Sequence, residues 1–225
     1  MKLSEFIARI KLQVPNMSET GVTDEYITVL LNTAANAVNL LAKAYSGYTD
    51  FNIEAEKRTY DLSLVCPTFL GRDKRGLFFK NASDQWEDII PKTEAWLSET
   101  HPDYLNASSV VIPDYYFIGG DTLGFYPPPS TTKASGARLY HLKKANPMTN
   151  ADHYPFSGTT TEITALSPLD DAIIAFCRWK LSPAFGAVSD TDLRYREYLL
   201  ECQKGSAQVR RSPDLMNDSG KSMKL

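Results

Sequence analysis

Cysteine and histidine are the side chains here that could supply nucleophilic or metal-binding chemistry, and both are scarce and widely spaced. The positions are Cys66, Cys177 and Cys202, with His101, His141 and His153. No CxxC or HExxH spacing occurs among them, so we expect no metal, no cofactor and no disulfide framework. We interpret the cysteines as reduced, partly buried thiols. A Cys–His pair assembled from distant segments stays open at this stage.

Other catalytic patterns are also missing from the sequence. It contains no GxxxxGK[ST], GxGxxG or GxSxG motif. Asp170 and Asp171 are adjacent carboxylates, which point about 100° apart on a helix and suit its N-terminus better than a shared site. Trp86 and Trp96 could form a platform for a sugar or a base, but packing of an amphipathic helix is the favoured interpretation. We therefore expect no enzyme.

One charged cluster, Arg72-Asp73-Lys74-Arg75-Gly76 followed by Lys80, could contact phosphate. The alternative is an ordinary solvated turn. The candidates for contact with DNA or a channel are Arg72, Lys74, Arg75 and Lys133. The formal charge of the 225-residue chain is only −3, so no field of the whole molecule would gather nucleic acid.

The elements that must position these residues predict an α+β fold. We expect a helical-bundle body with an inserted antiparallel β-hairpin or small sheet and an extended C-terminal tail. The expected helices are about 3–14, 23–46, 84–97, 168–181 and 190–203, and the β-structure is about 57–80 and 110–143.

Capping residues and turns support this assignment. Thr23 is a good N-cap, and Gly47 sits where a C-terminal glycine belongs. Pro91 favours two short helices within 84–97. The expected strands are 57–66, 77–80 after a turn at 72–76, 115–118 and 122–126 around Gly119-Gly120, and 137–143. We expect an exposed, flexible link over 127–136 and loops over 145–164.

The C-terminal segment 205–225 differs in composition from the body 1–204. It is polar, and four basic side chains outnumber two acidic ones. It cannot bury enough apolar surface to order alone, so we expect it to order only on a partner. Glu5 and Arg9 interrupt any apolar signal sequence, and no run approaches the ~20 residues of a membrane helix. We expect a soluble protein made in the cytoplasm, with no membrane partner.

In its order of features, the chain resembles the head-to-tail adaptor (connector) proteins of tailed bacteriophages over about residues 1–204. An N-terminal helical segment comes first and a pair of helices comes last. The features between them are Tyr60-Asp61-Leu62-Ser63-Leu64-Val65-Cys66-Pro67-Thr68-Phe69-Leu70, Trp86 with Ile89, Pro91 and Leu97, Pro113-Asp114-Tyr115-Tyr116, Gly120, Leu123, Tyr126-Pro127-Pro128-Pro129, Leu139 to Pro147-Met148-Thr149, and Pro155-Phe156.

The resemblance implies a structural protein of the virion neck. It implies a ring, typically of about twelve subunits, that docks under the portal, extends the channel for genomic DNA and carries the tail or neck proteins. It also implies that the C-terminal segment reaches along the portal. The residues of that segment proposed for portal binding are Gln208, Val209, Arg210, Arg211, Leu215, Met216, Lys221 and Lys224. Two alternatives stay open: a tail-completion or tail-tube-capping protein of the same particle, and a DNA-processing enzyme.

Overall fold

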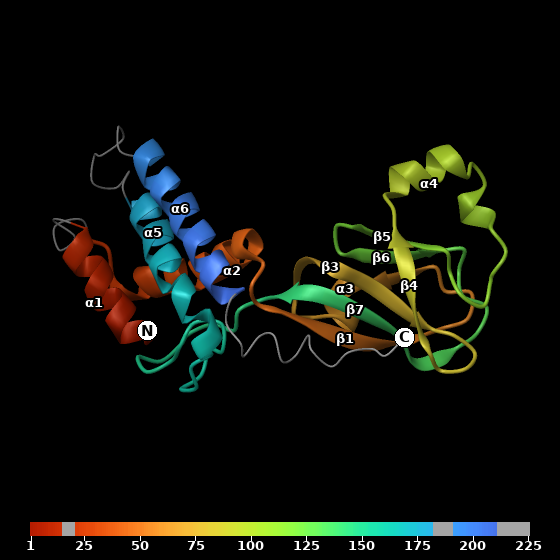
Figure 1. Cartoon of the computed structure of the whole chain (residues 1–225), viewed down its shortest axis with the longest axis horizontal. Coiled ribbons are helices and arrows are strands. Elements are labelled where there is room, and N and C mark those ends of the chain that lie inside the picture. The colour runs from red at the N-terminus through yellow and green to blue at the C-terminus, as the bar shows by residue number, and fades with distance from the viewer. Residues whose placement is uncertain (15–20, 182–190, 211–225) are drawn as a thin grey trace. The chain divides into compact units, whose positions relative to one another are not determined.

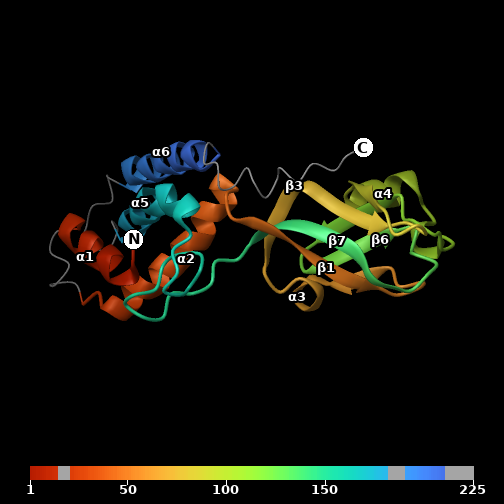
Figure 2. The same ribbon diagram turned by 60° about the horizontal axis from the view of Figure 1, so that its bottom comes forward.

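The computed structural model describes residues 1–14, 21–181 and 191–210, and its fold is α+β, as predicted (Figures 1 and 2). The chain divides into two compact units. The helical unit comprises residues 1–45 and the chain from 144 onward, and the sheet unit is Ser46–Lys143. Each has its own hydrophobic core. Among the described residues, no helix has both the length and the hydropathy that a membrane crossing requires.

In the described part of the helical unit there are four α-helices and one 3-10 helix. They are α1 (Leu3–Gln13), α2 (Asp24–Ala42), η3 (Thr164–Leu169), α5 (Asp170–Leu181) and α6 (Thr191–Val209). The loop before η3 is tied to α2, because the Asn32 side chain accepts from the N–H of Met148 at 2.8 Å and donates to its carbonyl at 3.1 Å. Side-chain hydrogen bonds therefore hold this loop in place, although its sequence has no helical or strand-like periodicity.

Helix α2 begins as predicted but ends earlier. Thr23 accepts a hydrogen bond from the Tyr26 N–H at 3.2 Å, which caps the first turn. The helix stops at Ala42, with Lys43 in the left-handed region (φ 52°). The buried Asn39 side chain accepts from the Tyr45 N–H at 2.8 Å and closes the turn. The predicted boundary at 46 is wrong, since Asn39 supplies the stop that we assigned to Gly47.

Helix α6 continues past the predicted boundary at 203 and ends at Val209. The Ser206 hydroxyl donates to the carbonyl of Ala42 at 3.0 Å, and Val209 is buried in the helical core. A Cβ on Gly205 would lie 2.6 Å from the carbonyl oxygen of Pro168, so this glycine allows α6 to approach η3 closely. The first residues of the predicted C-terminal segment thus belong to the helical unit.

Seven strands form one sheet in the sheet unit. They are β1 (Ser46–Ile53), β2 (Thr59–Asp61), β3 (Phe69–Lys80), β4 (Trp86–Pro91), β5 (Tyr115–Gly119), β6 (Thr122–Tyr126) and β7 (Lys133–Lys143), in the order β1-β7-β3-β4-β5-β6-β2. Helices α3 (Leu62–Val65) and α4 (Glu94–Thr100) and the 3-10 turn η2 (Tyr104–Asn106) lie in the connections.

The sheet unit begins and ends on neighbouring antiparallel strands, because Ser46 of β1 pairs with Leu142 of β7. Strand β1 was not predicted. Its alternation is present in the sequence, since Phe51 and Ile53 are buried while Tyr48 and Asp50 point outward. The start of β1 at Ser46 was missed because the predicted helix over 23–46 included that residue.

The predicted helix over 84–97 is wrong in its first half, which is strand β4. Ile89 of β4 pairs with Leu77, and both are buried. Pro91 ends the strand without losing a ladder bond. The N–H groups of Ile90 and Lys92 donate to the carbonyls of Asp114 and Tyr116. The position of Pro91 between them faces away from β5, toward the β3 side, where pairing has already ended at Ile89, so its missing N–H leaves no acceptor unpaired. Only α4 is helical, capped by Thr93.

Three further β predictions need correction. The predicted strand 57–66 is the short β2 followed by α3, because Asp61 caps a helix by accepting from the Ser63 N–H at 2.8 Å. The expected turn at 72–76 is a bulge within the continuous strand β3. The link 127–136 is not uniformly exposed, since Pro128, Pro129 and Gly136 are buried and β7 begins at Lys133.

The hairpin β5–β6 provides a test of close packing in the sheet. Phe117 pairs with Gly124, and a Cβ on Gly124 would lie 2.1 Å from the Phe117 ring. We expect Gly124→Ala to reduce the free energy of unfolding of the sheet unit by about 1–3 kcal/mol through overpacking. The control is Gly119→Ala, which meets only a carboxylate oxygen at 4.0 Å. Denaturant melts and hydrogen exchange of β5 and β6 would measure both, and equal stability of the variants would contradict this packing.

Candidate interaction surfaces

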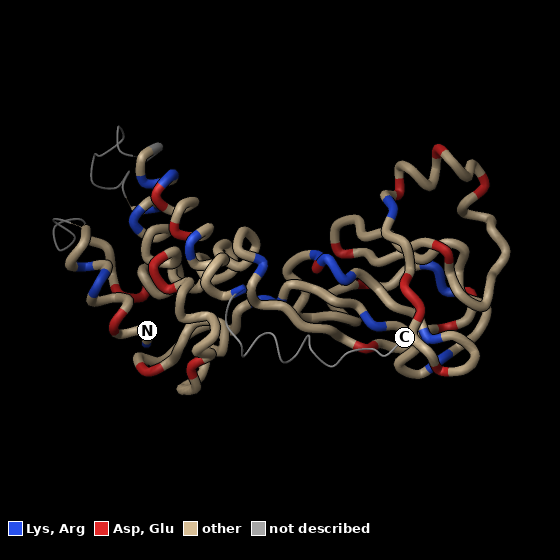
Figure 3. The backbone as a smooth tube through the Cα atoms, in the orientation of Figure 1, with Lys and Arg blue, Asp and Glu red and all other residues tan. Residues whose placement is uncertain are grey.

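The basic cluster of the sequence forms a bulge on strand β3. Arg72 pairs with His141 and Leu77 pairs with Leu139, so the four residues 73–76 of β3 lie opposite the single residue Tyr140 of β7. Gly76 has a φ of +72° at the end of this bulge. Figure 3 shows basic and acidic positions distributed along the backbone of the sheet unit. The bulge thus gathers Arg72, Lys74 and Arg75, as the sequence indicated.

Two of these three cations already have partners inside the protein. The Arg72 guanidinium donates to the carbonyl of Ile118 at 2.7 Å. Arg75 donates to the carboxylate of Asp73 at 2.9 Å and lies 4.3 Å from the Tyr140 ring centroid. Burial of Asp73 opposes its ionisation, but hydrogen bonds from Arg75 outweigh it and lower the pKa of Asp73. Within the described ranges Lys74 is exposed and has no ion pair, so it is the freest cation of the bulge.

Lys133 does not join this group. It pairs with Ile53 at the start of β7, whereas the bulge lies beside the other end of that strand. Its ammonium group is 2.7 Å from Asp84 and donates to the carbonyl of Asn81 at 2.5 Å. The four residues predicted for DNA contact therefore lie at two separate places on the sheet unit.

An aromatic and cationic ladder covers the outer face of the sheet, and it escaped the sequence analysis. Arg138 makes two hydrogen bonds to Asp50, at 2.6 and 2.8 Å, and lies 4.1 Å from the Tyr48 ring and 4.6 Å from the Trp86 ring. The bonds to Asp50 raise the pKa of Arg138. Tyr140 packs on Tyr48 at 5.7 Å. Alternating polar and aromatic residues in 46–53 and 137–143 were the available signal.

The ladder corrects the interpretation of the tryptophans as core residues of an amphipathic helix. Trp86 lies on strand β4, partly exposed, with Lys80 and Arg138 over its ring. Trp96 is on helix α4 and partly exposed, 5.2 Å from the Tyr115 ring. Neither ring is isolated, because each has neighbours that cover part of its face.

The structure does bring one cysteine and one histidine together. The sulfur of Cys66 is 3.5 Å from both ring nitrogens of His141, and the Thr68 hydroxyl is 3.0 Å from Nε2. Cys66 and His141 are 1% and 0% exposed. Burial lowers the pKa of His141. A substrate could not reach this pair, so we assign it to the polar packing of the sheet core.

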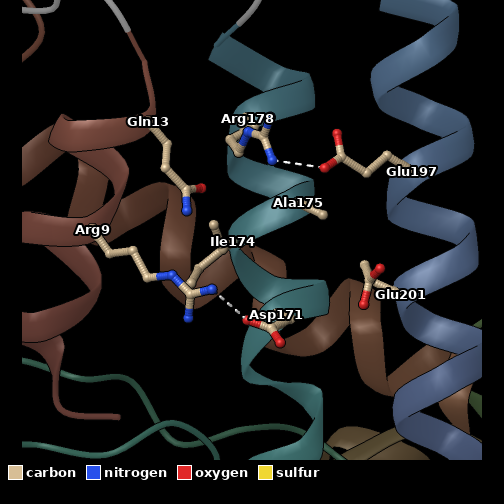
Figure 4. A pocket seen from close by; sticks show the side chains of 8 residues that line it. All are labelled: Arg9, Gln13, Asp171, Ile174, Ala175, Arg178, Glu197 and Glu201. Carbon is tan, nitrogen blue, oxygen red and sulfur yellow. Dashed lines mark hydrogen bonds and ion pairs between the residues drawn. The ribbon is translucent and has the colours of Figure 1, made fainter.

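The adjacent carboxylates Asp170 and Asp171 have different partners, which agrees with their angular separation. Asp170 contacts the Met1 amino group at 2.5 Å, and Asp171 contacts Arg9 at 2.8 Å. Asp171 lines a polar hollow of about 220 Å³ between α1, α5 and α6. The lining side chains, shown in Figure 4, are Arg9, Gln13, Asp171, Ile174, Ala175, Arg178, Glu197 and Glu201.

Ion pairs join the three helices around this hollow. Arg9 with Asp171 joins α1 to α5, and Arg178, which donates to Glu197 at 2.7 Å, joins α5 to α6. Glu201 accepts from Lys204 at 2.7 Å within α6 itself. The acidic side chains named here are therefore already engaged with basic ones. The arrangement holds helices together and offers no unpaired carboxylate cluster for acid–base chemistry.

Helix α2 presents an unusual outer face. The described helix has acidic residues only at Asp24 and Glu25, and no charged residue follows from Tyr26 to Ala42. Its inner side is buried in the helical core, yet Tyr26, Val29 and Leu40 on the outer side are 54%, 64% and 45% exposed. An apolar surface of this kind is typical of a protein interaction site.

The residues predicted for portal binding fall into two groups. Gln208 and Val209 lie in the last turn of α6, and Arg210 follows, its N–H donating to the carbonyl of Ser206 at 3.1 Å. Val209 is only 2% exposed, so it packs in the helical core and is not accessible to a partner. Arg211, Leu215, Met216, Lys221 and Lys224 lie outside the described residues.

Comparison with known protein families identifies the class of protein that carries these surfaces. The family model described as SU10 adaptor protein matches residues 1–218. The chain belongs to this family. A search of curated proteins found no match.

Family membership confirms the resemblance to phage head-to-tail adaptors that the features between Tyr60 and Phe156 indicated. The protein is a phage head-tail adaptor. Its family implies a place in the neck of the virion and interactions with phage portal and tail proteins. Such a structural family is generally non-enzymatic.

The buried His141 predicts a pH dependence of stability. Its pKa is lowered in the folded protein, whereas the unfolded chain has an ordinary value near ~6.5. As the pH falls below that value the unfolded state binds the proton first, so stability decreases. Asp170 acts in the opposite direction, because burial raises its pKa to about 6. The denaturation midpoints of wild type and His141→Gln should be measured from pH 7.5 to 5. The difference between them gives the contribution of His141 to the pH dependence of stability.

We expect the wild type to lose more stability than His141→Gln over that range. An NMR titration of the wild-type ring gives a second readout that needs no variant. The pKa of His141 should lie below the ordinary value near ~6.5, and a pKa at or above that value would contradict its burial with Cys66.

The hypothesis that the bulge contacts DNA also makes a specific prediction. Lys74→Ala should weaken DNA binding and reduce the slope of log K against log salt concentration by about 1, because one phosphate contact is lost. Lys133→Ala is the matched control at a separate site on the sheet unit. An unchanged affinity and slope for Lys74→Ala would remove the bulge from DNA contact.

Proposed function

We propose that this adaptor assembles as a ring of about twelve subunits beneath the portal. The ring extends the channel through which the genomic DNA passes and provides the platform on which the tail docks. The observation that carries the proposal is the family match over residues 1–218. The partners are other copies of the chain, the portal protein, tail or neck proteins and the DNA in the lumen.

Features of the described residues support this role. The helical and sheet units have separate cores, so each can keep its structure while its surface binds neighbours. A ring needs a heterologous contact in which two different surfaces of one subunit meet, repeated until it closes. Exposed apolar residues occur on both units, as at Val29 of α2 and Leu64 of α3. Ring assembly therefore has apolar surface available to it.

The C-terminal segment is proposed to dock on the portal. A flexible polar segment that folds on binding covers much surface of a partner while it stays free before assembly. Since α6 extends to Val209 and Ser206 binds Ala42, the part available for docking begins after Arg210. This region contains Arg211, Leu215, Met216, Lys221 and Lys224 from the predicted set.

A chain truncated after Arg210 should remain folded and lose docking to purified portal, which sedimentation of the mixture would measure. Truncation after Lys204 is the contrasting variant. It removes the buried Val209 and the Ser206 hydrogen bond, so it should also destabilise the helical unit. Full docking by the chain that ends at Arg210 would disprove the role of the segment.

The main alternative, a tail-completion or tail-tube-capping protein, gives a different result in the same experiment. Such a protein would bind purified tails and ignore the portal. Loss of head-to-tail joining in particles that lack the adaptor, with filled heads and complete tails accumulating separately, supports the proposed role. Particles that join normally without it would contradict that role.

A further inference from the structure

The outer face of α2 has the pattern of a helix-packing seam. Residues Tyr26, Thr33 and Leu40 are seven apart, and Leu30 and Ala37 lie between them at spacings of three and four. Because 3.6 residues make one turn, these positions share one side of the helix. The seam spans 14 residues, or roughly 21 Å. Its small central residues, Thr33 and Ala37, would allow another helix to approach closely.

A helix that carries apolar residues on a side away from its own core normally packs that side against a neighbour. The inner side of α2, with Ile27, Leu31 and Val38, is fully buried in the helical core. The outer side is not covered by the described residues, since Val29 is 64% and Leu41 is 49% exposed. The composition of α2 therefore indicates a partner that covers this outer side.

A matching surface lies on helix α6 of the same chain. Its outer face carries Leu193, Leu200 and Ala207, which are seven residues apart and all exposed, with Leu193 at 65% and Leu200 at 49%. This row also spans 14 residues, so the two seams have equal length. Arg196 and Gln203, between these positions, present long stems that cover apolar surface while their polar ends reach water.

Charge favours an antiparallel arrangement of the two helices. The only acidic residues of α2 are Asp24 and Glu25 in its first turn. The end of α6 has the basic residues Lys204 and Arg210, both exposed. Asp24 already pairs with Lys11 at 2.6 Å and Lys204 with Glu201 at 2.7 Å, so Glu25 and Arg210 carry the charge complementarity. When the helices run antiparallel, Glu25 and Arg210 meet and the helix dipoles align favourably.

We propose that the outer face of α2 binds the outer face of α6 on a second copy of this chain. In the antiparallel register Tyr26 lies beside Ala207, Thr33 beside Leu200, and Leu40 beside Leu193. Since every copy carries both faces, the contact is heterologous and repeats from one copy to the next. The inference names the lateral contact between neighbouring subunits of the proposed ring. The contact itself does not depend on the proposed function, but the closure of the ring does.

The size of the seam makes the contact weak between two free copies. A strip roughly 21 Å long and about 10 Å wide covers on the order of a few hundred Å², less than the ~800 Å² per partner of a stable complex. Each contact gains strength only when neighbours are held in place around a ring. A free chain at low concentration is thus a monomer with two unpaired faces.

Cysteine cross-linking tests the register. The double variant Thr33→Cys with Leu200→Cys should form, under oxidation, a ladder of covalent oligomers that extends beyond the dimer. Thr33→Cys alone and Leu200→Cys alone are the controls and should stay monomeric. The native Cys66, Cys177 and Cys202 are buried and should not react. The experiment uses the full chain, both alone at millimolar concentration and bound to purified portal.

A second pair of variants tests the energetics. Val29→Asp with Leu40→Asp places two charges on the exposed outer face of α2, with Leu40 in the seam and Val29 beside it. This variant should reduce lateral assembly at least tenfold without unfolding the helical unit. Leu105→Asp, at a residue of the sheet unit that is 64% exposed, as Val29 is, is the matched control and should assemble normally. Normal assembly of the α2 variant would overturn the inference.

The remaining outcomes identify what is wrong. Covalent dimers from Thr33→Cys alone would mean that α2 binds α2, and cross-links from α2 to the portal would mean that the portal covers it; each contradicts the inference. A wild-type ring on the portal without the ladder refutes the lateral contact and leaves the proposed function intact. A ladder from the free chain without portal binding supports the lateral contact and refutes docking under the portal.

Discussion

The antiparallel pairing of β1 with β7 is the constraint on which the rest of the architecture depends. Because Ser46 lies opposite Leu142, the chain enters and leaves the sheet unit on neighbouring strands. The segments before and after the insertion can therefore build a single helical core, with α2 packed against α5 and α6. Each unit buries its own hydrophobic residues, and neither has to supply apolar surface to complete the other's core.

The two units treat polar and apolar groups on their surfaces in opposite ways. On the sheet unit, the charges of Arg138 and Arg75 are matched by Asp50 and Asp73, and aromatic rings flank them. Such pairs are largely satisfied before any partner arrives. On the helical unit, the outer face of α2 leaves apolar side chains in water, which is unfavourable until another surface covers them. These surfaces suit a head-tail adaptor that binds its partners through complementary shape and apolar contact and not through a reaction.

Much of the fold was readable from the sequence where one local signal acted alone. The cap at Thr23, the glycine turn between β5 and β6 and the acidic start of α5 each matched the structure. The failures arose where a distant partner decided the outcome. Trp86–Pro91 is a strand because β3 and β5 pair with it, and α6 continues through Gly205 because η3 and Ala42 lie beside it. For the candidate site, the sequence was enough to group Arg72, Lys74 and Arg75. It could not reveal the internal partners of Arg72 and Arg75, the separate position of Lys133, or the ladder around Arg138. These three features depend on the register of the strands.

The central claim is that this adaptor acts by fitting against copies of itself and against the portal. Native mass spectrometry of the full chain, alone and mixed with purified portal, tests it most directly. The account predicts a monomer alone at micromolar concentration, and with portal a single complex that carries one closed ring of adaptor subunits. A portal whose mass is unchanged by the adaptor, or one that carries only a few scattered copies at saturation, would contradict the account.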